Sequence, residues 1–260
     1  MNNDYPTNLT DSQWQILQKL LEPAKTRRRK YPLRSIVNGI LYIVKTGCQW
    51  RMLPQDLPPY NLVFYYFTKW RREGLFEELM DAIRSMVRQK RGKEKSPSLG
   101  IIDARSVSTT QHVNTQRGID GNKKVKGRKV QLVVDTLGLP MAIIAHEANI
   151  HDSTGAVEAL ESMRFKYPRI KKVLADSGYA GEELRKITQQ LLGCELEVVR
   201  RPDECPKRFA VIPKRWIVER SFGWLCASRR LAKDYEFYPD TTVAMNQFAF
   251  IRIMLNRLCR

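Results

Sequence analysis

One apolar strand of this chain contains a carboxylate at a position where a hydrophobic side chain is expected. In Leu99-Gly-Ile-Ile-Asp-Ala-Arg-Ser-Val107, two isoleucines lead directly into Asp103. A carboxylate inside a strand must be paired, protonated or bound to a metal, because a buried uncompensated charge is costly. Asp103 therefore requires a fold that brings a cation to it. The alternative is an aspartate that caps a turn at the strand end.

Two later carboxylates occupy comparable positions. Asp176 ends the apolar segment Val173-Leu-Ala-Asp176, and Glu219 lies in the segment from Arg215 to Leu225. Each has an ordinary interpretation, a turn for Asp176 and an ion pair with Arg215 for Glu219. Together they favour a site for a divalent metal, since hard cations prefer carboxylate oxygens. Asp152 is the second choice for a contact at this site, and otherwise caps a helix.

The charge of the chain indicates its partner. A formal net charge of +18 over 260 residues favours a polyanion, and 43% hydrophobic residues indicate a folded protein rather than a basic tail. A membrane surface is the weaker alternative. The five cysteines form no C-x-x-C pair and no zinc-spaced cluster with histidine, and no Gly-rich phosphate loop is present. Structural zinc and an NTP-driven motor are therefore not supported.

The location expected from these features is the cytoplasm. The first ten residues lack a basic and then apolar signal segment, and the odd cysteine count is typical of a reducing compartment. The most apolar stretches are interrupted by Lys45, Lys69 and Arg252, so no membrane partner is expected.

Residues 1–90 carry the pattern of a helical, helix-turn-helix-like DNA-binding domain. Thr10-Asp-Ser-Gln13 predicts a capping box, and further helices are expected near Pro32, from Tyr60 to Arg72 and after Gly74. An ordinary helical bundle is the alternative, and Phe64 and Phe67 are expected in its core. The candidate DNA contacts are Arg51, Lys69, Arg71 and Arg72. Residues 91–98 have the composition of a linker.

Residues 99–260 predict an α/β catalytic domain. Strands are expected at 99–107, 130–135, 141–145, 173–176 and 195–199, and helices from 152 or 153, at 182–192, around Glu219 and from Asp240. This order is the ribonuclease H-like arrangement, a mixed five-stranded sheet with flanking helices. Its first and fourth strands are neighbours, so Asp103 and Asp176 are expected side by side.

The connection between the first two strands is strongly basic and is predicted as a loop that contacts phosphates. Its candidate contacts are Lys123, Lys124, Lys126, Arg128 and Lys129. Near Glu219, Trp216 is a candidate for stacking on an unpaired base.

Several motifs in this order resemble the DDE transposases of bacterial insertion sequences, most closely the insertion-sequence-five family. They are Ile102-Asp-Ala-Arg-Ser106, Lys126-Gly-Arg-Lys129, Val134-Asp-Thr-Leu-Gly138, Ala148-Asn-Ile-His-Asp152, Ala175-Asp-Ser-Gly-Tyr179 and the segment Trp216 to Leu225. Leu9-Thr-Asp-Ser-Gln-Trp14 and Gln49-Trp-Arg-Met-Leu-Pro54 resemble the start of that family. The resemblance implies that Asp103, Asp176 and Glu219 are the catalytic and metal-binding triad.

The resemblance also implies a mechanism and its partners. Two Mg²⁺ or Mn²⁺ ions activate water, which frees a 3′-hydroxyl at the transposon end, and this hydroxyl then attacks target DNA. A homodimer on paired terminal inverted repeats, associated with the bacterial nucleoid, is expected. The alternatives are a nuclease without strand transfer and a catalytically silent DNA-binding regulator.

A related family signature runs Tyr, Arg, Glu, Lys. Arg215 fills the Arg position, whereas Ile212 and Cys226 stand at the Tyr and Lys positions. The candidates for the missing cation are Arg220, Arg229 and Arg230, which together with Arg215 complete the predicted DNA contacts.

Overall fold

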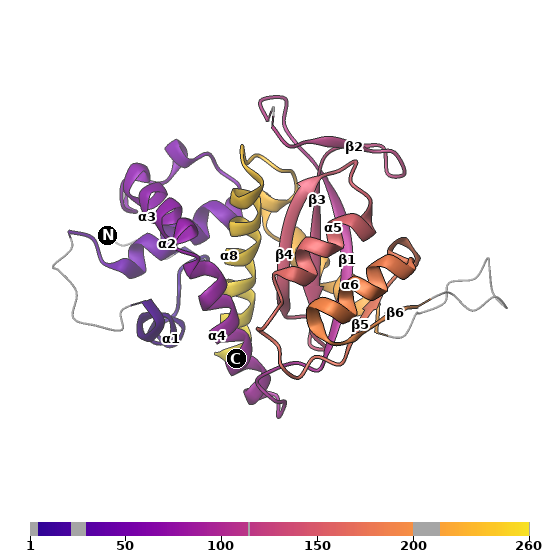
Figure 1. Ribbon diagram of the computed structural model, residues 1–260. Coiled ribbons are helices and arrows are strands. Elements are labelled where there is room, and N and C mark those ends of the chain that lie inside the picture. The colour runs from indigo at the N-terminus through magenta and orange to yellow at the C-terminus, as the bar shows by residue number, and fades with distance from the viewer. Residues whose placement is uncertain (1–4, 22–29, 114, 200–213, 260) are drawn as a thin grey trace.

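The computed structural model describes residues 5–21, 30–113, 115–199 and 214–259. Helices from the first third of the chain lie on one side of the molecule and the sheet lies on the other, with the C-terminal helix α8 between them (Figure 1). The N-terminal elements are α1 (Asp11–Leu21), α2 (Leu33–Thr46), the 3₁₀ turn η1 (Trp50–Met52), α3 (Tyr60–Arg72) and α4 (Leu75–Lys90).

The predicted capping box begins the first helix. The N–H of Gln13 donates to the Thr10 hydroxyl at 3.3 Å, and the N–H of Thr10 donates to Oε1 of Gln13 at 3.1 Å. Two helix-start donors are thereby satisfied reciprocally. At the end of α2, Gly47 has a φ of +73°, the left-handed conformation that ends a helix at little cost for glycine. Pro23, the predicted stop for α1, lies outside the described residues.

Among the described residues, six strands form one mixed sheet. They are β1 (Leu99–Ser108), β2 (Gly118–Asp120), β3 (Val125–Val134), β4 (Pro140–Glu147), β5 (Lys172–Ala175) and β6 (Glu195–Val198). The order along the sheet is β4-β3-β1-β5-β6, with β1 antiparallel to β3 and parallel to β5. The ribonuclease H-like arrangement is confirmed.

The strand β2 is the departure from the predicted five strands. It pairs with the start of β3, where Ile119 lies opposite Lys126. The basic connection predicted as a loop therefore supplies β2 and the first half of β3. Pairing with neighbouring strands, rather than local sequence preference, extends β3 into this basic segment.

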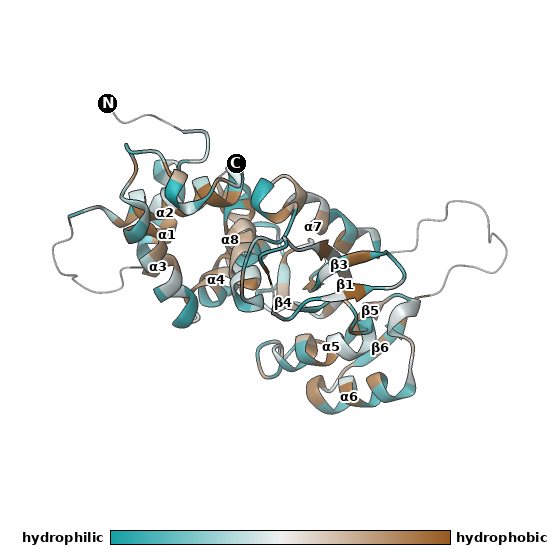
Figure 2. Cartoon of the chain, turned by 90° about the horizontal axis from the view of Figure 1, so that it is seen from above, coloured by the Kyte–Doolittle hydropathy of each residue, from teal (hydrophilic) through white to brown (hydrophobic). Residues whose placement is uncertain are grey.

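Side-chain alternation on β1 assigns the helices to the two faces of the sheet. Ile101 and Val107 pack in one apolar cluster with α7 (Trp216–Cys226) and α8 (Pro239–Leu258), whereas Ile102 packs with α5 (Asp152–Glu161) and α6 (Glu182–Leu192). Figure 2 shows α5 and α6 on one side of the strands and α7 on the other. Asp103, in phase with Ile101, thus belongs to the face that α7 covers.

The N-terminal helices and the sheet share a core through α8. Phe76 on α4 meets Phe248 on α8 with ring centroids 5.2 Å apart, and one cluster of buried apolar side chains extends from Leu9 to Leu255. Phe67 is buried as predicted, whereas Phe64 is 46% exposed, so that its predicted core position is wrong. None of the helices in the described ranges has both the length and the apolar character that crossing a membrane requires.

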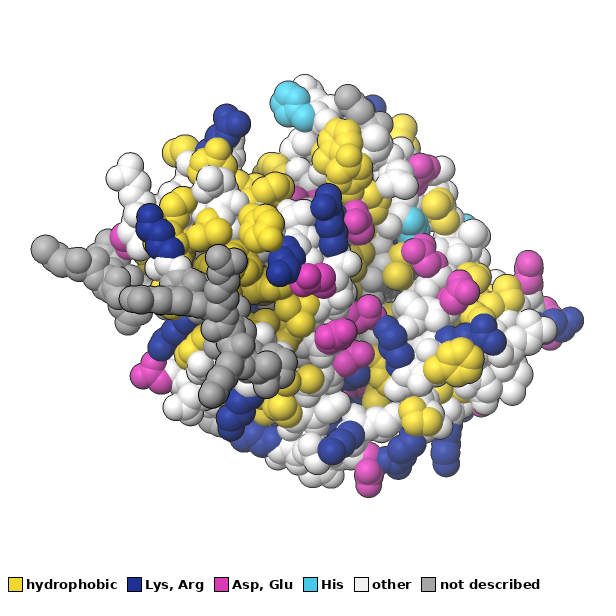
Figure 3. Space-filling model, turned by 60° about the vertical axis from the view of Figure 1, so that its left-hand side comes forward, with side chains coloured by type: hydrophobic (Ala, Val, Ile, Leu, Met, Phe, Trp, Pro, Cys, Tyr) yellow, Lys and Arg dark blue, Asp and Glu magenta, His cyan; other side chains and the backbone are white. Residues whose placement is uncertain are grey.

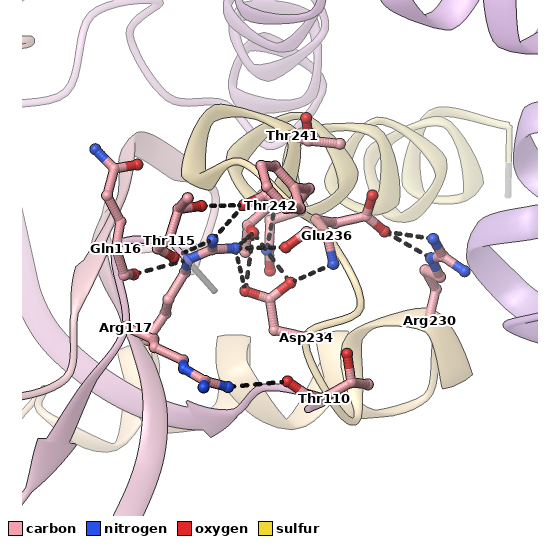
Figure 4. Close-up of polar contacts among 12 residues, drawn as sticks. Thr110, Thr115, Gln116, Arg117, Arg230, Asp234, Glu236, Thr241 and Thr242 are labelled. Atoms are coloured by element: carbon pink, nitrogen blue, oxygen red, sulfur yellow. Dashed lines mark hydrogen bonds and ion pairs between the residues drawn. The ribbon is translucent and has the colours of Figure 1, made fainter. Parts of the chain in front are cut away.

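A buried arginine ties β3 to the start of α8. The fully buried Arg128 donates to Asp234 Oδ2 at 3.0 Å and to the carbonyl oxygens of Glu236 and Phe237 at 2.7 and 2.6 Å (Figure 4). Asp234 in turn accepts a hydrogen bond from the Thr242 hydroxyl of α8 at 3.0 Å. The predicted phosphate contact is wrong for Arg128, because its guanidinium is buried and is bound by Asp234 and by backbone oxygens.

The Arg128 ion pair should contribute substantially to stability. Arg128→Met leaves the Asp234 carboxylate buried without its cation, and we expect the free energy of unfolding to fall by about 3–5 kcal/mol. Urea denaturation measures the loss. Lys126→Met on the same strand is the control, since Lys126 is exposed and should change stability by less than about 0.5 kcal/mol. Equal losses in both variants would contradict this account of the pair.

Candidate active site

Two of the predicted carboxylates lie at the ends of adjacent strands. The parallel pairing of β1 with β5 places Ile101 opposite Leu174, and two residues further the same register brings Asp103 beside Asp176. Asp176 follows β5 directly and caps the turn that succeeds it, since its Oδ1 accepts the N–H of Gly178 at 2.8 Å. The turn interpretation of Asp176 is therefore correct, and its role in a metal site stays a prediction.

The third carboxylate joins this pair through an arginine. Nη2 of Arg215 lies 3.3 Å from Oδ2 of Asp176 and 3.7 Å from Oε1 of Glu219. Arg215 immediately precedes α7, the helix that covers this face of the sheet, and its side chain is only 16% exposed. Asp103 thus lies beside Asp176 at the carboxyl ends of β1 and β5, and Arg215 links Asp176 to Glu219.

The carboxyl group of Asp103 has a raised pKa, chiefly because it is buried. Burial raises its pKa to about 6, and the negative charge of Asp176 adds to the effect. The N–H of Ala104 and the charges of Arg215 and Lys123 act in the opposite direction without cancelling it. An aspartate in this state is stabilised as a carboxylate by any further cation.

The donor set fits a hard divalent cation. Carboxylate oxygens are the ligands that Mg²⁺ and Mn²⁺ prefer, and Asp103 and Asp176 lie at adjacent strand ends. Among the described residues, no three His, Cys, Asp or Glu side chains lie close enough together to form a metal-binding group. Glu219 is connected to Asp176 through Arg215, which contacts both carboxylates.

A polar layer beneath the carboxylates was not anticipated from the sequence. The Tyr179 hydroxyl donates to Oε1 of Gln131 at 2.6 Å, and Nε2 of Gln131 donates to the backbone oxygen of Asp152 at 3.1 Å. Burial raises the pKa of Tyr179, and the charges of Asp103, Asp152 and Asp176 raise it further. The neutral Tyr179 hydroxyl acts here as a hydrogen-bond donor that positions Gln131. The sequence signal for Tyr179 was its place directly after Asp176-Ser-Gly.

Asp152 belongs to the surroundings of the site. A β-carbon on Gly178 would lie 3.0 Å from Oδ1 of Asp176 and 3.4 Å from Oδ2 of Asp152, so both carboxylates approach the same glycine. Oδ1 of Asp152 pairs with Nζ of Lys129 at 2.8 Å. The predicted cap of α5 is wrong, because His151 rather than Asp152 is the N-cap residue.

Two further predicted DNA contacts point into the protein. Lys129 is buried and binds Asp152 and the backbone oxygen of Ile150 at 2.8 Å, so it positions the loop beside the site. Arg230 is buried and pairs with Glu236 at 2.7 Å. The expectation of a phosphate contact is wrong for both side chains in this structure, since each is occupied by an internal acceptor.

Other predicted contacts remain at the surface. Exposed side chains are those of Arg51, Lys69, Arg72, Lys126 and Arg229. Arg71 instead links α3 to α8 through Asp240 at 2.9 Å and Thr241 at 2.6 Å.

Three side chains one turn apart form a stack along α7. The guanidinium of Arg220 lies 4.5 Å from the ring centroid of Trp216 and 4.7 Å from that of Trp224. Arg220 also donates to the backbone oxygen of Leu137 at 3.2 Å, and burial lowers its pKa. Trp216, at the outer end of the stack, is 45% exposed, so its ring keeps one face available beside Glu219.

Residues 94–254, which include all three carboxylates, match the family described as "Transposase DDE domain". The chain belongs to this family of insertion-sequence transposases. Residues 9–80 match a second family, described as "Putative transposase of IS4/5 family", in agreement with the resemblance to the insertion-sequence-five group.

Curated relatives agree with this assignment. A protein of Burkholderia cepacia named "Putative transposase for insertion sequence element IS402" is 31% identical over 143 residues, 52% of this chain and 65% of that protein. An uncharacterized 16.2 kDa protein of the same element is 30% identical over 88 residues, 31% of this chain and 60% of that protein. The chain therefore spans somewhat less than two thirds of the length of each relative.

The raised pKa of Asp103 predicts a pH dependence of stability. Because the folded protein binds this proton more tightly than the unfolded chain, the contribution of Asp103 is full below about pH 4 and is lost as pH rises through about 6. Asp103→Asn should therefore gain about 2 kcal/mol relative to the wild type between pH 4.5 and pH 8. Denaturation in chelator at several pH values measures this, with exposed Glu183→Gln as the control. A parallel profile for Asp103→Asn and wild type would refute the assignment.

Proposed function

We propose that this chain is a DNA transposase that binds the ends of its element, cleaves phosphodiester bonds with metal-activated water and joins the freed 3′-hydroxyl to target DNA. The observation that carries the proposal is the anionic pair Asp103 and Asp176 at adjacent strand ends, linked to Glu219 by Arg215, within the region that matches the DDE family. The family match supports the class of reaction, and the Asp103–Asp176 pair supports the location of the active site in this chain.

Asp103, Asp176 and Glu219 are proposed to hold Mg²⁺ or Mn²⁺, with two ions expected. When bound, the ions lower the pKa of water and stabilise the leaving oxygen. The residues of the chain provide the charge and the positioning. Arg215 offsets one of the two negative charges on Asp176 and Glu219, and the hydrogen bond from Gly178 fixes the orientation of the Asp176 carboxylate.

The N-terminal helices are proposed to bind DNA outside the active site. We keep residues 1–90 as a helical DNA-binding domain, 91–98 as a linker and 99–260 as the catalytic domain, a division supported by separate family matches to residues 9–80 and 94–254. Arg51 on η1 and Lys69 and Arg72 on α3 are exposed. On the face that carries these helices, Lys and Arg side chains stand among apolar ones (Figure 3), as a surface that approaches both phosphates and bases requires.

The assembly is proposed to be a homodimer on two paired element ends, acting on DNA in the cytoplasm. Joining requires two ends at one target, and a net charge of +18 on each chain favours DNA as the bridge between copies. The relative named for IS402 supports an insertion element as the natural substrate.

Cleavage and joining of a duplex that carries the element's own end test this function. With Mg²⁺ or Mn²⁺, the wild type should yield joined product, and Asp176→Ala should lower it by more than about 100-fold, since even outer partners of metal ligands cost 10–100-fold. Glu183→Gln, on the exposed side of α6, should retain wild-type yield.

Other outcomes of the same assay would replace the proposal. Cutting without joining would identify a nuclease, and salt-sensitive binding without cutting by either protein would identify a DNA-binding regulator. A divalent metal should also raise the Tm of the wild type more than that of Asp176→Ala, which reports metal binding independently of turnover.

A further inference from the structure

Arg105 of β1 contacts Cys226, which stands at the lysine position of the family signature. Nη1 of Arg105 donates to Sγ of Cys226 at 3.0 Å. Arg105 lies two residues after Asp103 on β1, so both side chains belong to the face that α7 covers. Cys226 is the last residue of α7, about two turns beyond Glu219. The contact therefore bridges the strand and the helix that carry two of the three carboxylates.

Arg105 keeps its charge uncompensated. Within the described ranges, no carboxylate lies within ion-pairing distance of its guanidinium, and a thiol is only a weak acceptor. Other arginines of the core are neutralised, as Arg128 is by Asp234 and Arg230 by Glu236. A planar guanidinium held in place without a counter-ion presents the fork that binds a phosphate through two N–H groups.

Of the three arginines that the sequence offered for this role, two are engaged by other side chains and the third lies beside a different helix. Arg220 is stacked between Trp216 and Trp224, and Arg230 is buried against Glu236. Arg229 lies on η3 (Arg229–Leu231), against the end of α2, where a β-carbon on Gly47 would lie 3.2 Å from Cβ of Arg229. None of the three is described in contact with Cys226.

We propose that Arg105 is the phosphate-binding cation of the active site, which holds a DNA phosphate beside the one that reacts, and that the small neutral side chain of Cys226 leaves room for it. The inference rests on the proposed function, because it assigns part of the DNA contact at the same site. In this proposal the cation comes from β1, the strand that carries Asp103, and not from α7, where the signature has lysine.

Binding of the end duplex without divalent metal tests this role apart from catalysis. Anisotropy titrations of the full chain over a range of salt concentrations should show that Arg105→Gln weakens binding roughly tenfold and lowers the salt slope by about one, as the loss of one charged phosphate contact does. Arg105→Lys should retain most of the affinity. Arg185→Ala removes an exposed arginine of α6 on the opposite face and is the matched control.

A charge-relocation variant provides the decisive comparison. Arg105→Gln combined with Cys226→Lys returns a cation to the same place from α7, and it should recover the affinity and the salt slope that Arg105→Gln loses. Wild-type affinity and slope in Arg105→Gln, or a double variant as weak as the single one, would overturn the role of Arg105. Absence of salt-sensitive binding by the wild type itself would overturn the proposed function as well. Matching Tm values across the variants show that the differences arise from contacts with DNA.

Discussion

The candidate site depends on one unfavourable arrangement, a buried Asp103 carboxyl group beside the carboxylate of Asp176. Burial is the main cause that raises the pKa of Asp103 to about 6, and parallel pairing of β1 with β5 makes Asp176 a neighbour whose charge raises it further. A fold keeps such a pair only when surrounding contacts fix the strands independently of it. Here both strands lie within a sheet that is packed on each face, so the core fixes the two carboxylates close together. Arg215, which precedes α7, contacts Asp176 and compensates part of their negative charge.

The basic charge of the chain serves two different purposes. Part of it is internal, because Arg88, Arg128 and Arg230 each pair with a buried carboxylate. Removal of one partner leaves the other charge buried and unpaired, which lowers the free energy of unfolding strongly. These arginines therefore serve the stability of the fold and do not contact a ligand. Other cations, including Lys69 and Arg72 on α3, have exposed side chains, and Lys69 also lies 3.8 Å from Glu73. Net charge alone therefore overstates the positive surface available to DNA.

Local signals in the sequence predicted the helices and strands well, but they did not predict which basic side chains are buried. The capping box at Thr10, the span of α3 and the order of the strands follow from periodicity and turn chemistry, and strand order then places Asp103 beside Asp176. Burial of Arg128 and Lys129 depends instead on the groups that cover the two faces of the sheet, Asp234 for Arg128 and Asp152 for Lys129, which no local pattern reveals. The supporting roles of Gln131 and Tyr179 were missed for the same reason, since each depends on a partner distant in the sequence.

Helix α8 connects the N-terminal helices to the sheet more firmly than residues 91–98 alone would. Its start is held by the Arg128 network and by Arg71 of α3, and its middle packs against Phe76 of α4. The same helix contributes Met245 and Phe248 to the cluster that covers the sheet face bearing Asp103. Since packed interiors deform little, α3 and the carboxylates are held at a fixed separation. DNA gripped by α3 would then approach the site along a defined path, and the geometry of the complex would be set largely before binding.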